Sequence, residues 1–123
     1  MPLKPPRPTE SELAILRILW ERGPSTVREV VDSSAPGTGY TTVLKMLQIM
    51  TDKGLVLCDN SARTHVFRPT HPETQTQRQL VDDLMERAFG GSAHKLVLQA
   101  LSGSKPSPQE LAELRRLLNS LNK

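Results

Sequence analysis

Residues 25–54 read STVREVVDSSAPGTGYTTVLKMLQIMTDKG, and this stretch decides the fold. Thr26 and Glu29 have the spacing of a capping box, which predicts a helix of about two turns. A turn rich in serine, proline and glycine follows at 33–39. A helical period then resumes over 40–53 and stops at a glycine. Two helices joined by a tight turn form a helix-turn-helix arrangement.

A helix and a hairpin are predicted on either side of this stretch. Upstream, Thr9 and Glu12 repeat the capping-box pattern, and the helix that they start runs to a Gly-Pro pair. Downstream, β-prone runs at 55–58 and 64–68 enclose a polar segment, which predicts a two-stranded hairpin, or wing. The order of these elements predicts a winged helix-turn-helix domain over residues 9–70.

The two ends of the chain differ in composition from this domain. Residues 1–8 hold four prolines and predict a flexible, extended tail. Residues 71–123 carry three further helical patterns, over 73–89, over 92–101 and from 107 onward. The predicted fold class is therefore mostly α with a small β-hairpin.

Leucines repeat along the last of these helices with the spacing of a seam between packed helices. A chain of 123 residues whose second half is helical has little N-terminal surface left to cover such a seam. We therefore expect two copies to pair, so that residues 71–123 form a helical dimerisation region. The residues expected in this contact are Leu80, Leu84, Phe89, Leu111, Leu114, Leu118 and Leu121.

The helix over 40–53 has one apolar face and one polar face. Short hydrogen-bonding side chains and one cation on the polar face suit the groove of double-stranded DNA. The candidate DNA contacts are Tyr40 and Arg63 with the backbone, and Thr41, Thr42, Lys45 and Gln48 with bases or phosphates. The plain alternatives are a solvated helix face and, for Arg63, a polar hairpin tip.

Composition excludes several other classes of protein. Hydrophobic residues make up 37% of the chain and charged residues 24%, which is typical of a folded domain and not of a disordered one. No apolar run approaches the roughly 18 residues of a membrane span, and no signal peptide is recognisable. We therefore expect a cytoplasmic protein without membrane insertion. The net charge of +3 suits a nucleic-acid partner.

No cofactor, metal site or enzymatic activity is expected. Cys58 is the only cysteine, which excludes an internal disulfide, and it is predicted to be a small buried hydrophobe. The histidines are too scattered along the sequence for zinc-ligand spacing. The adjacent carboxylates Asp82 and Asp83 point to different helix faces, which argues against a small hydrolase.

Four stretches together carry a resemblance to a known family. They are LAILRILW at 13–20, VREV at 27–30, YTTV at 40–43 and KGLV at 53–56. The chain resembles the penicillinase-repressor family of winged-helix regulators, of the BlaI, MecI and CopY type, over nearly its whole length. The resemblance implies a homodimer that represses transcription at an operator with dyad symmetry. It also implies that helix 40–53 enters the major groove.

The resemblance further implies that repression is relieved by proteolysis in the C-terminal helices, through a membrane sensor protease. The antibiotic-responsive members are cleaved at an Asn-Phe bond, where this chain has Gln99-Ala100. A protease pocket built for an aromatic side chain loses several contacts with alanine. A response to β-lactams does not follow from the resemblance. The copper-responsive members carry a cysteine cluster that this chain lacks.

The polar helix face also fits a second function, that of a winged-helix protein-interaction module with weak or absent DNA binding. The two functions differ in how the affinity for DNA depends on salt. Contacts with phosphates release counterions, so only a DNA-binding protein shows an affinity for DNA that falls steeply as salt is added.

Overall fold

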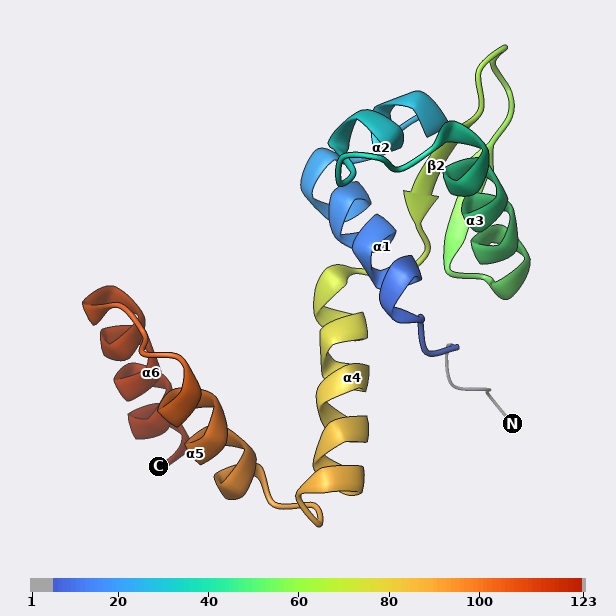
Figure 1. Cartoon of the computed structure of the whole chain (residues 1–123). Helices are drawn as coiled ribbons and strands as arrows, with labels where there is room; N and C mark the ends of the chain where they lie inside the picture. The colour runs from blue at the N-terminus through green and yellow to red at the C-terminus, as the bar shows by residue number, and fades with distance from the viewer. Residues whose placement is uncertain (1–5, 123) are drawn as a thin grey trace. The chain divides into compact units, whose positions relative to one another are not determined.

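The computed structural model describes residues 6–122, which form six helices and one two-stranded sheet (Figure 1). The elements are α1 Glu10–Arg22, α2 Val27–Ser33, α3 Tyr40–Lys53, β1 Val56–Asp59, β2 Val66–Pro69, α4 Glu73–Ala88, α5 Ala93–Gly103 and α6 Pro108–Leu121. This order confirms the predicted fold class. Contacts divide the chain into two compact units between Leu80 and Val81, so α4 begins in the first unit and ends in the second.

The first two helices begin where the capping boxes predict them. The hydroxyls of Thr9 and Thr26 each accept a hydrogen bond of 3.2 Å from the amide of the glutamate three residues later. In return, the side chains of Glu12 and Glu29 each accept a hydrogen bond of 2.9 Å from the backbone amide of the threonine. A cap of this kind contributes about 1 kcal/mol to helix stability. The threonines thus fix the starting points of α1 and α2.

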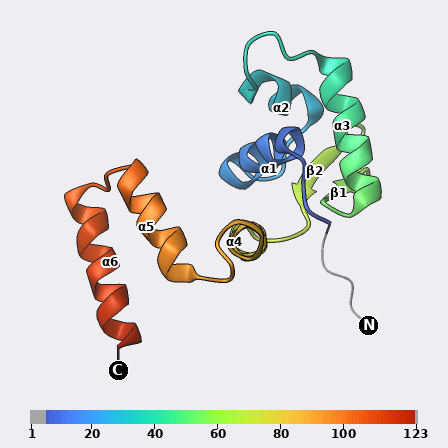
Figure 2. The ribbon, with the colours of Figure 1, turned by 60° about the horizontal axis from the view of Figure 1, so that its bottom comes forward.

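The core of the first unit lies where three helices meet the hairpin. α1 packs on α2 and β2, while α3 packs on α2 and β1. β2 lies between α1 and α3 in both views (Figures 1 and 2). Cys58 is half-buried and packs against this core, as a small hydrophobe would. The buried side chains are Ile15, Leu16, Leu19, Val27, Val30, Val43, Leu47, Met50, Leu55, Val56 and Phe67.

Backbone hydrogen bonds join the hairpin to the neighbouring helical segments. β1 and β2 pair in antiparallel register, with Cys58 opposite Phe67. Ser25, between α1 and α2, exchanges two backbone hydrogen bonds with Phe67, of 2.9 and 2.8 Å. β1 starts one residue later than predicted, because the Leu55 amide donates to the Met50 carbonyl and closes the end of α3. β2 starts two residues later than predicted. The wing is therefore held in place relative to α3.

The second unit consists of helices that bury almost nothing within one chain. α5 and α6 run side by side (Figures 1 and 2), and no side chain in residues 81–122 is buried. The exposed large apolar side chains of this unit are Val81, Leu84, Val97, Leu98, Leu101, Leu117, Leu118 and Leu121. Most helical stability in proteins comes from packing an apolar face. Within residues 6–122, no helix is long and apolar enough to cross a membrane.

Candidate nucleic-acid interface

α3 is amphipathic in the way that the sequence predicts. Val43, Leu47 and Met50 are fully buried against α2 and the hairpin. The opposite side of the helix is open to solvent, and it carries the predicted contacts Thr41, Thr42, Lys45 and Gln48, all of them exposed. The packed side fixes the position of the helix. The open side therefore presents hydroxyls, an amide and a cation on a rigid element.

The start of α3 is open to an acceptor from outside. Gly39 precedes the helix, and no side chain of the described residues caps this start. The amides of the first turn of a helix have no partner within the helix, and they favour an anion. Tyr40, the first residue of α3, is 43% exposed at the same place. A phosphate oxygen could therefore approach this end of α3.

Arg28, on α2, lies beside the start of α3, although no pattern in the sequence singles it out. Its guanidinium carbon lies 5.0 Å from the centroid of the Tyr40 ring. This distance lies within the range of a cation–π interaction. The pair joins α2 to the start of α3 across the turn between them. An arginine on a short surface helix is common, so only the three-dimensional contact reveals it.

The wing leaves β1 through a turn built around Asp59. Asp59 Oδ1 accepts hydrogen bonds from the Ser61 hydroxyl at 2.6 Å and from the Ser61 amide at 2.9 Å. These two hydrogen bonds, with the positive charge of Arg68, hold the pKa of the Asp59 carboxyl below its ordinary value. Asp59 therefore stays ionised at neutral pH and keeps the turn closed. Arg63 lies beyond this turn and is exposed.

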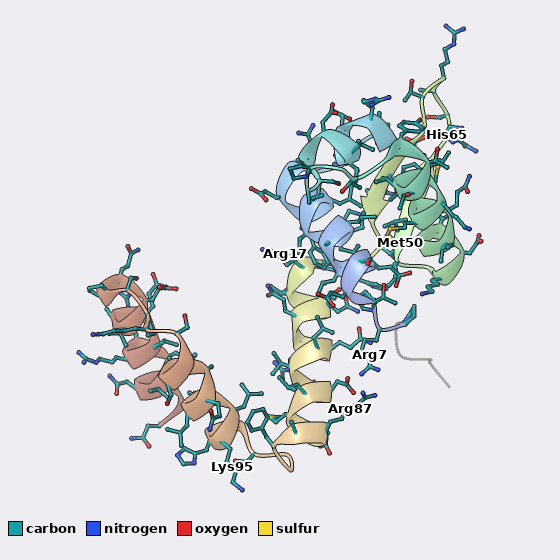
Figure 3. All side chains as sticks on the ribbon, viewed as in Figure 1. Arg7, Arg17, Met50, His65, Arg87 and Lys95 are labelled. Carbon is teal, nitrogen blue, oxygen red and sulfur yellow. The ribbon has the colours of Figure 1, made fainter. Side chains whose placement is uncertain are left out.

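A groove of about 370 Å³ lies between α2, the start of α3 and the wing. Arg28 and Tyr40 line it from the helices, and Arg63 and His65 line it from the wing. Figure 3 shows His65 on the wing, well separated from Arg17 on α1. Within residues 6–122, no carboxylate forms an ion pair with Arg28 or Arg63. The groove is thus lined by two cations, Arg28 from α2 and Arg63 from the wing, and neither forms an ion pair within the described residues.

The structure brings some of the predicted contact residues together and leaves others apart. Tyr40 and Arg63 share the groove, while the other four candidates lie along α3 outside its lining. In the second unit Leu84, Leu118 and Leu121 are 50%, 62% and 72% exposed. The remaining residues of the predicted dimer contact are half-buried, namely Leu80, Phe89, Leu111 and Leu114. No group of three potential metal ligands occurs in residues 6–122.

Comparison with known proteins shows to which family the chain belongs. The family model of the penicillinase repressor matches residues 8–120. The penicillinase repressor of Bacillus licheniformis is 22% identical over 117 residues, which cover 94% of this chain and 91% of that protein. The transcriptional regulator BlaI of Mycobacterium tuberculosis is 31% identical over 113 residues, which cover 89% of this chain and 81% of that protein.

A solved structure matches the fold as well. It is the solution structure of the monomeric form of BlaI from Bacillus licheniformis in complex with the blaP half-operator. The match has a TM-score of 0.50 at 22% identity and covers 58% of this chain and 90% of that one. It agrees with the winged-helix fold that the sequence predicts. By the extent of the family match and the identity to the Mycobacterium tuberculosis regulator, the chain belongs to the penicillinase repressor family, whose members are transcriptional regulators and not enzymes.

Proposed function

We propose that this chain is a cytoplasmic repressor that binds double-stranded operator DNA as a homodimer. The observation that carries the proposal is the exposed polar face of α3, which is backed by a fully buried apolar face. A winged helix places such a helix in the major groove, with its wing on the adjacent backbone or minor groove. The complex of the Bacillus licheniformis BlaI with a half-operator supports the same use here.

The roles of the individual side chains follow from their chemistry. Lys45 can donate to the O6 and N7 acceptors of guanine or to a phosphate, and Gln48 can pair with the N6 and N7 of adenine. The hydroxyls of Thr41 and Thr42 reach bases or phosphates from the first turn of α3. Arg63 contacts the backbone from the wing, and Tyr40 supports a backbone contact at the start of α3. Both set the register of the domain without reading sequence.

Dimerisation through residues 71–123 is the second part of the proposal, with residues 9–70 as the DNA-binding domain. It is supported by the absence of any buried side chain in residues 81–122, since the apolar faces of α4, α5 and α6 find too little cover within one chain. A two-fold dimer presents two copies of α3, so the operator has dyad symmetry. Binding both half-sites together raises the affinity well above that of one domain.

Relief of repression by cleavage within α5 is the third part. Gln99 and Ala100 are exposed on this helix, and no residue of α5 is buried. A helix that packs so lightly within its own chain opens locally at low cost, as a protease requires. The protease that fits is a membrane sensor whose pocket accepts a small side chain at the position of Ala100. A protease whose pocket is built for an aromatic ring therefore does not fit this chain.

Salt-dependent binding to DNA tests the first part. A labelled duplex is titrated with the purified full chain at several salt concentrations, and fluorescence anisotropy gives the affinity. We expect the logarithm of the affinity to fall linearly with the logarithm of salt, with a slope of about 0.9 for each phosphate contact. A folded protein with no such DNA binding would instead be a protein-interaction module.

A further inference from the structure

We infer that the groove between α2, the start of α3 and the wing binds one backbone phosphate of DNA, with Arg28 as its principal ligand. The inference rests on the proposed function, because it assigns a further contact of the same DNA. It adds to that function a residue outside α3 and outside the wing. It also gives Tyr40 a role different from that of a direct contact.

Arg28 lines the groove and lies beside the start of α3. Its guanidinium carbon lies 5.0 Å from the centroid of the Tyr40 ring. An arginine that stacks on a ring uses its face for the stacking, so the N–H groups at its edge stay available to an acceptor. No acceptor in residues 6–122 forms an ion pair with this guanidinium. The guanidinium of Arg28 is thus held over the Tyr40 ring, and no carboxylate of the described residues competes for its donors.

The other residues of the groove also offer donors to an anion. Arg63, Thr64 and His65 line the groove from the wing, and they add a second cation, a hydroxyl and an imidazole. No carboxylate is among the described residues that line the groove. Leu44 and Phe67 are the large apolar residues of this lining. A phosphate group, with several oxygen acceptors, matches this set of donors.

The position of the groove identifies the phosphate as one of the DNA backbone. The groove adjoins the first residue of α3, and the exposed face of α3 continues from there. With α3 in the major groove, the backbone strand that borders the major groove passes this end of the helix. A contact of this kind carries no sequence information, so its loss weakens binding to every DNA sequence alike.

Tyr40 is the positioning residue of this site. Its ring supplies the surface on which Arg28 stacks, whereas its hydroxyl is not needed for stacking. Replacement by phenylalanine should therefore preserve the phosphate contact. Replacement by leucine should lose the contact, because the guanidinium would no longer be held over the groove.

The test compares Arg28→Gln with Arg17→Gln in the anisotropy titration, from about 50 to 200 mM salt. Arg17 is an exposed arginine of α1 in the same unit, separated from the wing (Figure 3), so it controls for the change in net charge. Arg28→Gln should lower the salt slope by about 1.8, because the dimer loses one phosphate contact in each subunit, and should weaken binding roughly sixtyfold at 100 mM salt. The loss should be equal for specific and random duplexes, and Arg17→Gln should leave both slope and affinity unchanged.

Variants of Tyr40 complete the test. Tyr40→Phe should bind as the unchanged protein does, and Tyr40→Leu should reproduce the loss seen in Arg28→Gln. The double variant Arg28→Gln with Tyr40→Leu should lose no more than either single variant, because the two side chains act as a unit. Arg28→Lys keeps the charge but not the planar donor fork, so it should retain the salt slope and bind more weakly.

The possible outcomes separate this inference from the proposed function. If the unchanged protein shows no salt-dependent DNA binding, the proposed function fails, and the inference fails with it. If the unchanged protein binds but Arg28→Gln has the same salt slope, the inference is overturned and the proposed function stands. A loss confined to one DNA sequence would also overturn it, because Arg28 would then be reading a base. Circular dichroism of each variant confirms that the helices are intact.

Discussion

Lys53 Nζ lies 2.8 Å from Glu12 Oε2, so the last turn of α3 is joined to the first turn of α1 by an ion pair. Glu12 is also the capping-box residue of α1, and it is buried. At the other end of α3, Tyr40 lies under Arg28 of α2. The helix proposed to read DNA is thus fastened at both ends to the helices before it, which suits a rigid reader of base edges.

Removal of the lysine partner should destabilise the first unit. Lys53→Met leaves the Glu12 carboxylate buried without its cation, and breaking a fully buried pair costs about 3–5 kcal/mol. The Lys53 side chain is 39% exposed, so water screens part of the interaction. We expect a loss of about 1–2 kcal/mol in the free energy of unfolding. Urea unfolding at one fixed protein concentration measures it.

The control for this prediction is an ion pair with both partners exposed. Arg22 Nη2 lies 3.1 Å from Glu29 Oε2, and the two side chains are both more than one-third exposed. Arg22→Met should change the free energy of unfolding by less than about 0.5 kcal/mol. Equal effects of the two methionine variants would show that burial of Glu12 adds nothing to its pair with Lys53.

The same carboxylate should make stability depend on pH in the acidic range. Burial raises the pKa of Glu12, but the hydrogen bonds from Lys53 and Thr9 outweigh it and hold the pKa below its ordinary value of 4.5. A lowered pKa in the folded state gives stability that is fully present above the unfolded value and is lost as the pH falls through the folded one. The stability advantage over Glu12→Gln should therefore shrink as the pH falls below about 4.5.

Unfolding of both proteins in urea, at steps from neutral pH downward, measures this advantage. Other carboxyls with a lowered pKa, such as that of Glu29, are present in both proteins and cancel in the difference. A difference that stays constant with pH would mean that ionisation of Glu12 does not stabilise the fold.

Lys45 should be a direct contributor to DNA affinity. Lys45→Ala should weaken binding by about 1–3 kcal/mol if the side chain meets a base, and the dimer should stay intact. Lys95→Ala removes an exposed lysine from α5 and should leave DNA affinity unchanged. Anisotropy titration of the two alanine variants on one duplex makes the comparison, and equal affinities would remove Lys45 from the interface.

The leucine seam of α6 should control the oligomeric state. Leu114→Asp combined with Leu118→Asp places two charges in an apolar contact and should leave monomers, because buried unpaired charge is costly. Arg116 and Ser120 lie on the opposite side of the same helix and are exposed. The matched double variant Arg116→Asp with Ser120→Asp should remain dimeric. Sedimentation velocity distinguishes the two results, and a dimer that survives both leucine changes would refute the seam.

The features that the sequence predicted well are local ones. Thr9, Thr26 and Ser107 each mark a helix start, because a capping box needs only residues three positions apart. The end of α3 is equally local, because Gly54 takes a left-handed backbone conformation, with φ 82°, that favours glycine. The polar face of α3 followed from helical periodicity alone.

The features that the sequence could not predict join residues distant along the chain. Lys53 and Glu12 are 41 positions apart, and nothing in either local pattern indicates that they pair. Ser25 pairs with Phe67 through the backbone, which leaves no signature in side-chain composition. Arg28 enters the candidate site only through packing on Tyr40. Such contacts depend on the tertiary arrangement of α1, α2, α3 and the hairpin.

The central claim is that two copies of α3 read a symmetric DNA sequence, and selection from a random pool tests it most directly. The purified full chain is mixed with random duplex DNA at near-physiological salt, where non-specific binding is weak, and the bound sequences are amplified and read. The account predicts an inverted repeat whose half-sites lie one helical turn, or a multiple of it, apart. A folded, dimeric protein that enriches no sequence would contradict it and would favour a protein-interaction module.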